Sequence, residues 1–260
     1  MTWIEALLLG LVQGLTEFLP VSSSGHLELG KVLLDIEAKE SLTFSIIVHA
    51  ATVLSIIVVF FKNIRELFSG LIKFQWNEST IYSAKIAVSM IPVGIVGVFF
   101  MTEVESVYNG NIVFVGSMLL VTASLLLLTY LAKSKDKDVS YRDAFIIGIA
   151  QAFAVMPGIS RSGATIATGL FLGVRKDLVT RFSFLMVLVP IIGATIFDIV
   201  RADDPDAVAI GIIPLLIGFV AAFLSGLFAC RIMLNIVRQG KLIYFAIYCI
   251  LAASIAIFLG

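Results

Sequence analysis

The sequence predicts an all-α, polytopic membrane protein in which six spanning helices and two re-entrant, broken helices form an inverted-topology repeat. Of its 260 residues, 60% are hydrophobic and only 14% are charged, with a mean hydropathy of +1.07. A soluble domain carries about 25% charged residues. This difference excludes an ordinary soluble protein, a disordered chain and a nucleic-acid-binding protein. Besides this composition, two further observations predict the fold class: a set of long apolar windows, and a pair of similar interruptions in the apolar sequence.

The first apolar region, Ala6–Leu27, is interrupted by Glu17, by Pro20 and by the serines and glycine of 22–25. Each of its two halves is shorter than the roughly 17–25 residues that a spanning helix needs. Irregular backbone at membrane depth is tolerated only where it is buried in protein or lines a wet cavity. We therefore expect the segment 6–34 to be a broken helix that enters and leaves the membrane from one side.

Six windows are long and free, or nearly free, of charged residues, and three of them lie between the two interrupted regions. They are Ser41–Phe61, Ile86–Thr102, Ser106–Ala132, Phe182–Phe197, Ala207–Cys230 and Leu242–Gly260. The second interrupted region, 144–174, contains Pro157, Gly158 and the run Ser160–Gly163, which includes Arg161. We expect it to be the second re-entrant segment. Cys230 and Cys249 lie in apolar runs and are expected to be small core residues.

The basic residues are concentrated in four connections, and this concentration predicts the orientation. Fourteen of the 18 lysines and arginines fall in 62–85, 133–143, 175–181 and 231–241, whereas the connections 28–40, 102–110 and 198–206 are mainly acidic. The positive-inside rule places the basic set in the cytoplasm. The segment 6–34 then opens outward, and 144–174 opens toward the cytoplasm.

The two halves of the single predicted domain, about 1–132 and 144–260, carry matching motifs. Ala6–Gln13 matches Ala144–Gln151 at an offset of 138, and Ser22-x-Ser24-Gly25 matches Ser160-x-Ser162-Gly163 at the same offset. Inverted repeats with broken helices place a binding site where the halves meet. The alternative is that the serines and glycines only allow close helix packing.

The polar residues of the two breaks predict a phosphate or diphosphate site. Glu17 lies one turn after Gln13 on the same helix face, and His26 follows the serines on the next helix. Arginine recognises phosphate bidentately, and helix N-termini bind anions. Glu17 and Arg161 could instead be a buried ion pair, and His49 is expected to be structural. The phosphate-binding candidates are Ser22, Ser24, Gly25, Ser160, Ser162, Gly163, Thr165 and Arg161.

These motifs resemble the undecaprenyl-diphosphate phosphatase, or bacitracin-resistance, family. The likeness is carried by Gln13-x-x-x-Glu17-Phe-Leu-Pro-Val-Ser-Ser-x-Gly-His26 and by Pro157-Gly-x-Ser-Arg161-Ser-Gly-Ala-Thr165, with Arg181-Phe-Ser-Phe and Phe245-Ala-Ile-Tyr248. The resemblance implies a membrane enzyme that removes the terminal phosphate of undecaprenyl diphosphate for cell-wall synthesis. It also implies a divalent cation, Mg²⁺ or Ca²⁺, which Gln13 and Glu17 would hold.

The resemblance further implies that Glu17, Ser23, His26 and Arg161 form the catalytic group. The family motif can begin with Glu, and Gln13 cannot act as a base. The nucleophile stays open between Ser23, His26 and a water molecule. The expected partners are the polyprenyl lipid and the bilayer of the bacterial cytoplasmic membrane, with the active site open to the outer side and no nucleic acid. The alternative function is a transporter or flippase for an anionic polyprenyl lipid, since transporters share inverted repeats.

Overall fold

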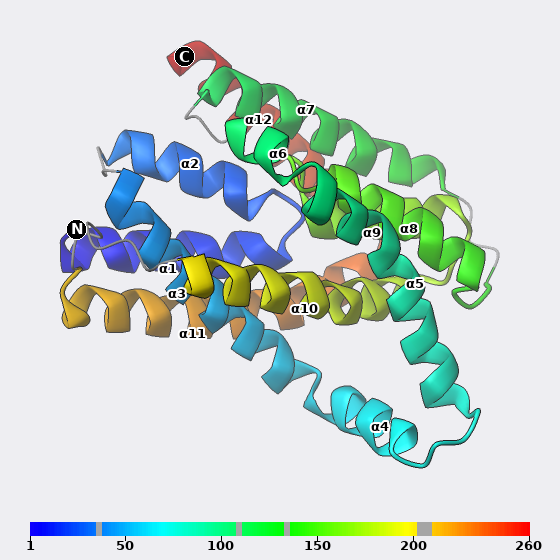
Figure 1. Cartoon of the computed structure of the whole chain (residues 1–260). Helices are drawn as coiled ribbons and strands as arrows, with labels where there is room; N and C mark the ends of the chain where they lie inside the picture. The colour runs from blue at the N-terminus through cyan, green and yellow to red at the C-terminus, as the bar shows by residue number, and fades with distance from the viewer. Residues whose placement is uncertain (35–37, 108–110, 133–135, 202–209) are drawn as a thin grey trace.

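The computed structural model describes residues 1–34, 38–107, 111–132, 136–201 and 210–260 (Figure 1). Several charges used to predict the orientation lie outside these residues, namely Asp35, Glu37, Lys133, Lys135, Asp203, Asp204 and Asp206. The described residues form helices and one isolated bridge between Lys137 and Val174, with no strand among them. The elements are α1 (Trp3–Phe18), α2 (Ser23–Leu33), α3 (Ala38–Val59), α4 (Phe61–Leu71), α5 (Glu78–Phe99), α6 (Met101–Val107), α7 (Ile112–Leu128), η1 (Thr129–Leu131), α8 (Tyr141–Phe153), α9 (Arg161–Phe171), α10 (Lys176–Arg201), α11 (Ile212–Arg238) and α12 (Ile243–Leu259).

The all-α membrane fold is confirmed, although the count of six spans is not. Four helical stretches of the described chain are long and apolar enough to cross a bilayer, namely Glu78–Phe99, Ile112–Leu131, Lys176–Ile196 and Ile212–Arg238. A fifth span arises if Thr43–Val59 and Phe61–Leu71, which are bent by 77° at their junction, count as one. The sixth predicted window is the apolar helix α12, whose stretch Ile243–Phe258 is shorter than these spans.

The expectation of plain connections at 62–85, 175–181 and 231–241 is wrong, because all three are partly helical. Residues 62–85 include most of α4 and the start of α5, where the Asn77 side chain caps the helix by accepting a hydrogen bond from the Thr80 N–H. The helix α10 already begins at Lys176, and α11 continues to Arg238. Lysine and arginine are good helix formers. A search for charge-free windows finds only the apolar part of each helix.

Both interrupted regions form a helix, a break and a second helix. In the first, Leu19 ends α1 in an extended conformation before Pro20, as expected for a residue preceding proline. In the second, Gly158 has a φ of +97°, a conformation that favours glycine. Figure 1 shows α1 and α2 extending toward the end of the molecule at which the N-terminus lies, and α8 and α9 extending toward the opposite end. The two hairpins therefore enter from opposite sides.

The helix packing follows the inverted repeat. If α1, α3, α5 and α7 of the first half correspond to α8, α10, α11 and α12 of the second, each contact should have a counterpart. The helix α1 packs along α11, and its counterpart α8 packs along α5. The corresponding helices α7 and α12 pack against each other, as do α3 and α10. The contacts between the halves are thus related by a pseudo-twofold axis.

The repeated Ala-x-x-x-Gly motif lies at a close helix contact in each half. A Cβ atom on Gly10 would lie 2.5 Å from the carbonyl oxygen of Gly218 on α11, and a Cβ on Gly148 would overlap the carbonyl oxygen of Ser89 on α5. Ala6 and Ala144, which begin the motif in each half, are fully buried. This part of the repeat therefore serves helix packing. This is the alternative to a binding role that was considered for the repeat above.

The largest apolar core lies at the contact between the halves and supports the break after α1. Phe18 is buried directly after Glu17, and its ring meets the ring of Phe184 on α10 edge-on at 6.0 Å. Ile56 from α3 and Met233 from α11 are completely buried in the same cluster. The position of Phe18 in this core fixes the end of α1 and with it the direction of the Glu17 side chain.

Candidate functional site

The two breaks touch each other where the hairpins meet. A Cβ atom on Gly25 would lie 3.1 Å from the Cα of Gly158, and a Cβ on Gly163 would lie 3.3 Å from the Cβ of Pro20. The hydroxyl of Ser162 also donates a 3.4 Å hydrogen bond to the carbonyl oxygen of Leu19. The structure therefore brings the N-termini of α2 and α9 together, as the sequence predicts.

The serines that precede these two helices are N-caps. The Ser22 hydroxyl accepts the Gly25 N–H at 3.3 Å, and the Ser160 hydroxyl accepts the Gly163 N–H at 3.1 Å. Ser22 has a φ of +70°, which is strained for a residue with a side chain. Strain of this kind persists where the surrounding structure enforces it and is often found at functional sites. The recurring Ser-x-Ser-Gly motif therefore has a structural role at both helix starts.

Two polar side chains bind the same carboxylate oxygen of Glu17. The hydroxyl of Ser23 donates to Oε2 of Glu17 at 2.5 Å, and Nε2 of Gln13 donates to that oxygen at 3.0 Å. Arg161 lies close enough to interact electrostatically with the carboxylate. The predicted group of Gln13, Glu17, Ser23 and Arg161 is therefore assembled around one carboxylate.

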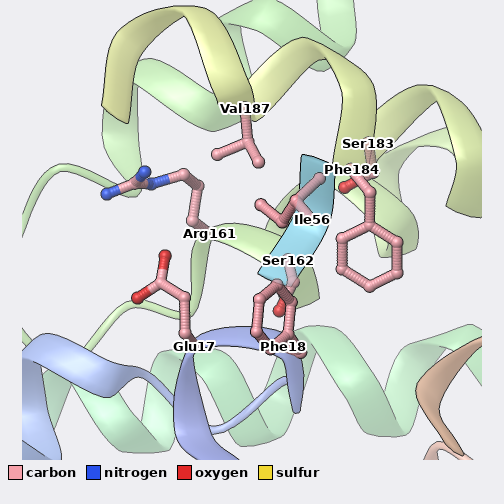
Figure 2. A pocket seen from close by; sticks show the side chains of 8 residues that line it. All are labelled: Glu17, Phe18, Ile56, Arg161, Ser162, Ser183, Phe184 and Val187. Atoms are coloured by element: carbon pink, nitrogen blue, oxygen red, sulfur yellow. The ribbon is translucent and has the colours of Figure 1, made fainter. Parts of the chain in front are cut away.

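Glu17 and Arg161 lie at the polar end of a small pocket between α1, α3, α9 and α10 (Figure 2). Figure 2 shows the carboxylate and the guanidinium side by side at one end and the rings of Phe18 and Phe184 at the other. The lining is completed by Ile56, Ser162, Ser183 and Val187. The pocket therefore combines a charged end with an apolar wall.

The guanidinium of Arg161 keeps its donors available. It makes no hydrogen bond or ion pair within 4.0 Å to any residue in the described part of the chain. A guanidinium offers five N–H donors in a planar fork that matches phosphate oxygens. The electrostatic attraction to Glu17 holds the side chain at the pocket without using those donors. This arrangement differs from the direct ion pair that the sequence left open.

The remaining predicted phosphate-binding residues are mostly engaged elsewhere. The hydroxyl of Thr165 donates to the carbonyl oxygen of Arg161 at 2.8 Å and pairs with the Ser183 hydroxyl. The Ser24 hydroxyl oxygen lies 3.4 Å from the Ser22 hydroxyl oxygen, and Ser160 is the N-cap of α9. Among these serines and glycines, only Ser162 is found in the lining of the described pocket.

His26 is not among the residues that line this pocket, and its ring contacts α12 instead. Its Nδ1 lies 2.8 Å from the carbonyl oxygen of Ser22, and its Nε2 lies 2.8 Å from the hydroxyl of Tyr248. Within the described residues, its side chain makes no hydrogen bond to Ser23 or Glu17. The structure thus separates the predicted catalytic residues into two groups, Glu17 with Ser23 and Arg161, and His26 with Tyr248.

The structure brings three residues near the predicted site residues to which no chemical role was assigned from the sequence, namely His49, Ser183 and Tyr248. His49, on α3, interacts electrostatically with Glu17, and it lies two turns before the pocket-lining Ile56 on the same helix face. Ser183 lines the pocket as well. The signals for Ser183 and Tyr248 were present in the motifs Arg181-Phe-Ser-Phe and Phe245-Ala-Ile-Tyr248, which carried resemblance but no assigned chemistry.

The residues near Glu17 offer oxygen ligands for a hard cation. The Oε1 atom of the fully buried Gln13 has no hydrogen-bond partner in the described structure, which is costly unless a ligand binds it. Carboxylate and amide oxygens are ligands that Mg²⁺ and Ca²⁺ accept. No group of three or more His, Cys, Asp or Glu side chains suited to a metal occurs among the described residues. A cation here would need further oxygen ligands from water or substrate.

Comparison with known proteins matches the chain to the family described as bacitracin resistance protein BacA over residues 6–255. The chain is also similar to proteins named undecaprenyl-diphosphatase. One from Parabacteroides distasonis is 56% identical over 99% of this chain and 98% of that protein. One from Bacteroides fragilis is 54% identical over the same shares, and one from Salinibacter ruber is 42% identical over the whole of both chains.

Proposed function

The chain belongs to the bacitracin resistance protein BacA family, and from this premise we propose how its residues act. It is a membrane hydrolase that converts undecaprenyl diphosphate to undecaprenyl phosphate and inorganic phosphate. This reaction recycles the lipid carrier for cell-wall synthesis and confers bacitracin resistance. The observation that carries the assignment is the 56% identity to an undecaprenyl-diphosphatase over 99% of the chain. The transporter alternative rests on the inverted repeat and the predicted midplane anion site, and it gains no support from these relatives.

Arg161 binds the terminal phosphoryl group. Its guanidinium faces the pocket with unused donors, and it sits at the first residue of α9, where backbone N–H groups also favour an anion. Charge develops on the phosphoryl oxygens in the transition state, so fixed donors stabilise it more than the ground state. The apolar wall of Phe18, Phe184 and Val187 faces the lipid side of the diphosphate.

Ser23 is the nucleophile and Glu17 is its general base. The 2.5 Å hydrogen bond from the hydroxyl to the carboxylate is the geometry that this pairing requires. Ser23 attacks the terminal phosphorus, and its proton passes to Glu17. The bond from that phosphorus to the bridging oxygen breaks, and the departing undecaprenyl phosphate takes the proton from Glu17. Water then attacks the phosphoserine and gives a proton to Glu17, which returns it to Ser23 as inorganic phosphate leaves.

A divalent cation fits beside this group and would be held by Gln13 and Glu17. The support is the buried, unpartnered Oε1 of Gln13 next to a carboxylate. When bound, such an ion supplies positive charge that neutralises the diphosphate. If the site exists, Mg²⁺ should raise the midpoint of thermal unfolding of the wild-type protein in detergent, and Glu17→Gln should abolish the increase.

The substrate enters from the outer side of the bacterial cytoplasmic membrane. The support is the distribution of basic connections together with the direction of the α1–α2 hairpin, which extends toward the end of the molecule opposite to the α8–α9 hairpin. The polyprenyl tail then leaves the pocket sideways into the bilayer.

The decisive experiment measures products with the purified, detergent-solubilised protein. Wild-type protein should release one inorganic phosphate for each undecaprenyl phosphate formed, in a medium where no vectorial transport is possible. Substrate labelled in its terminal phosphate and quenched during turnover should label the peptide that contains Ser23, and Ser23→Ala should remove that label. Absence of phosphate release from a folded wild-type protein would reject the function. Release without labelling of Ser23 would reject the serine nucleophile.

A further inference from the structure

His26 is held between two partners that come from different halves of the molecule. Its Nδ1 lies 2.8 Å from the carbonyl oxygen of Ser22 on its own helix start. Its Nε2 lies 2.8 Å from the hydroxyl of Tyr248 on α12, which is 222 residues away in sequence. The two rings are nearly parallel, with an interplanar angle of 12° and centroids 5.5 Å apart. Both nitrogens and the ring plane of His26 are therefore fixed.

The chemistry of the two partners determines where the imidazole carries its hydrogen. A carbonyl oxygen can only accept, so in the neutral ring Nδ1 must carry the hydrogen and donate to Ser22. Nε2 is then an acceptor, and the Tyr248 hydroxyl must donate to it. Without the tyrosine, the Ser22 carbonyl alone would restrain the ring, and nothing would hold Nε2 in place.

The backbone at Ser22 supports this arrangement. The φ of +70° at this residue is strained, and its carbonyl oxygen accepts both the His26 side chain and the His26 N–H, the latter at 3.1 Å. Ser22 directly precedes the proposed nucleophile Ser23. A tyrosine that fixes the His26 ring therefore also restrains the turn from which the nucleophile is presented.

We propose that Tyr248 is a positioning residue of the phosphatase, which fixes the tautomer and orientation of His26 across the interface between the two halves. The proposal rests on the function proposed above, and it takes His26 as part of the active site because the family resemblance places this residue in the catalytic group. Partners that orient a metal-binding imidazole contribute about 10- to 100-fold to metal affinity or activity, and we expect an orienting partner of His26 to contribute at the lower end of that range. Tyr248 itself touches neither the phosphate nor Ser23 in this arrangement.

The sequence makes a direct test possible, because the chain contains only two histidines, His26 and His49. Protein labelled with ¹⁵N-histidine therefore gives two sets of imidazole signals, and His49→Gln assigns them. In the wild type, the Nε2 signal of His26 should show the shift of a hydrogen-bonded acceptor. Tyr248→Phe keeps the ring but removes the hydroxyl. We expect this variant to shift the Nε2 signal, to lower kcat about tenfold and to change KM less than twofold.

The matched control is Tyr244→Phe, one turn earlier on the same helix, where the side chain is 65% exposed. This variant should keep wild-type ¹⁵N signals and kcat. The proposal is overturned if Tyr248→Phe leaves the His26 signal unchanged, or if the signal shifts while kcat stays at the wild-type value. A folded wild-type protein that releases no phosphate would reject the proposed function instead, and the ¹⁵N spectrum would still report the contact itself.

Discussion

Ser23 and Arg161 occupy the same position in the two inverted halves: each is the first residue of its broken helix, and they are 138 residues apart in the sequence. The repeat brings both residues to one carboxylate, because Glu17 binds Ser23 directly and attracts Arg161. Equivalent positions thus carry different chemistry. In the proposed mechanism, Ser23 is the nucleophile and Arg161 is the cation that binds the phosphoryl group.

The pair of Glu17 and Ser23 gives the first prediction. Glu17→Gln keeps the size of the side chain but removes the base, so kcat should fall by about 100-fold or more. Ser23→Ala should have an effect of similar size, and the double variant should be little worse than either single one, since the two residues act as a unit. Steady-state phosphate release in detergent measures all three. Ser254→Ala, at an exposed position of α12 outside the site, is the control and should retain most of the activity; additive losses from Glu17→Gln and Ser23→Ala would contradict the pairing.

Arg161 gives a prediction about charge and shape. Arg161→Ala should lower kcat by about 10²–10³-fold, the loss typical of one fixed charge-stabilising donor. Arg161→Lys keeps the charge but loses the planar fork, so it should recover only part of that loss. Arg238→Ala, at the end of α11, is a matched control that should be neutral. Full activity in Arg161→Lys would show that charge alone is needed.

Gly148 gives a prediction about stability. A Cβ at this position would overlap the backbone of Ser89 on α5, so Gly148→Ala should destabilise the protein by about 1–3 kcal/mol. Gly94→Ala on α5 is the control, because nothing lies within 4 Å of the added Cβ, and it should be neutral or slightly stabilising. Thermal unfolding in detergent measures both variants. Equal midpoints would mean that α5 and α8 are not tightly packed.

Asp143, at the start of α8, gives a prediction about pH. Burial opposes its ionisation, but hydrogen bonds from Ser140 and Lys137 outweigh this effect and lower the pKa of the carboxyl. Because the pKa is lowered in the folded protein, the ionised carboxylate stabilises the fold at pH values above its ordinary pKa of 3.8. This contribution is lost as the pH falls below that value. Asp143→Asn should therefore cost about 1–3 kcal/mol at neutral pH, and the difference from wild type should shrink below pH 4.

The control for Asp143 is Asp177→Asn, which breaks the more exposed ion pair with Arg175. An exposed pair contributes at most about 1 kcal/mol. Unfolding midpoints measured from neutral to acidic pH compare the two variants. A difference between wild type and Asp143→Asn that does not depend on pH would contradict the assigned contacts.

The helix α4 gives a prediction about the membrane surface. Phe61, Phe68 and Ile72 form an exposed apolar stripe on and just after this helix, and Lys62 lies on a different face. Such helices lie in the bilayer interface, where tryptophan is also favoured. Trp76 follows α4 and is 75% exposed. In vesicles, Trp76 should be quenched by lipids brominated near the headgroup.

Trp3→Phe leaves Trp76 as the only tryptophan, so the quenching can be assigned to it. The matched variant Trp76→Phe reports Trp3 instead. Replacing Lys62 and Lys73 by glutamine should weaken the quenching of Trp76 in vesicles rich in anionic lipid and leave that of Trp3 unchanged. No quenching of Trp76 in any vesicle would place α4 away from the bilayer.

The sequence predicts the broken hairpins and most of the Glu17 group because these depend on local rules. Proline and glycine end helices where they occur, and a charged residue inside an apolar segment must face protein or a cavity. Glu17 and Arg161 could therefore be recognised without a fold. The predicted span boundaries were less accurate, because basic residues at helix ends, such as Lys176 and Arg238, were assigned to the connections between spans.

The sequence alone predicted the all-α membrane class and the inverted repeat, and it singled out Glu17 and Arg161 as candidate site residues, to which the family resemblance added Ser23. Only the tertiary structure decided that Ser23 binds Glu17, that His49 approaches the same carboxylate and that His26 turns toward Tyr248. The reason is physical: periodicity tells which face of a helix is buried, but the partner across that face depends on how the two halves pack. Residues 222 positions apart meet because the fold brings α2 and α12 together.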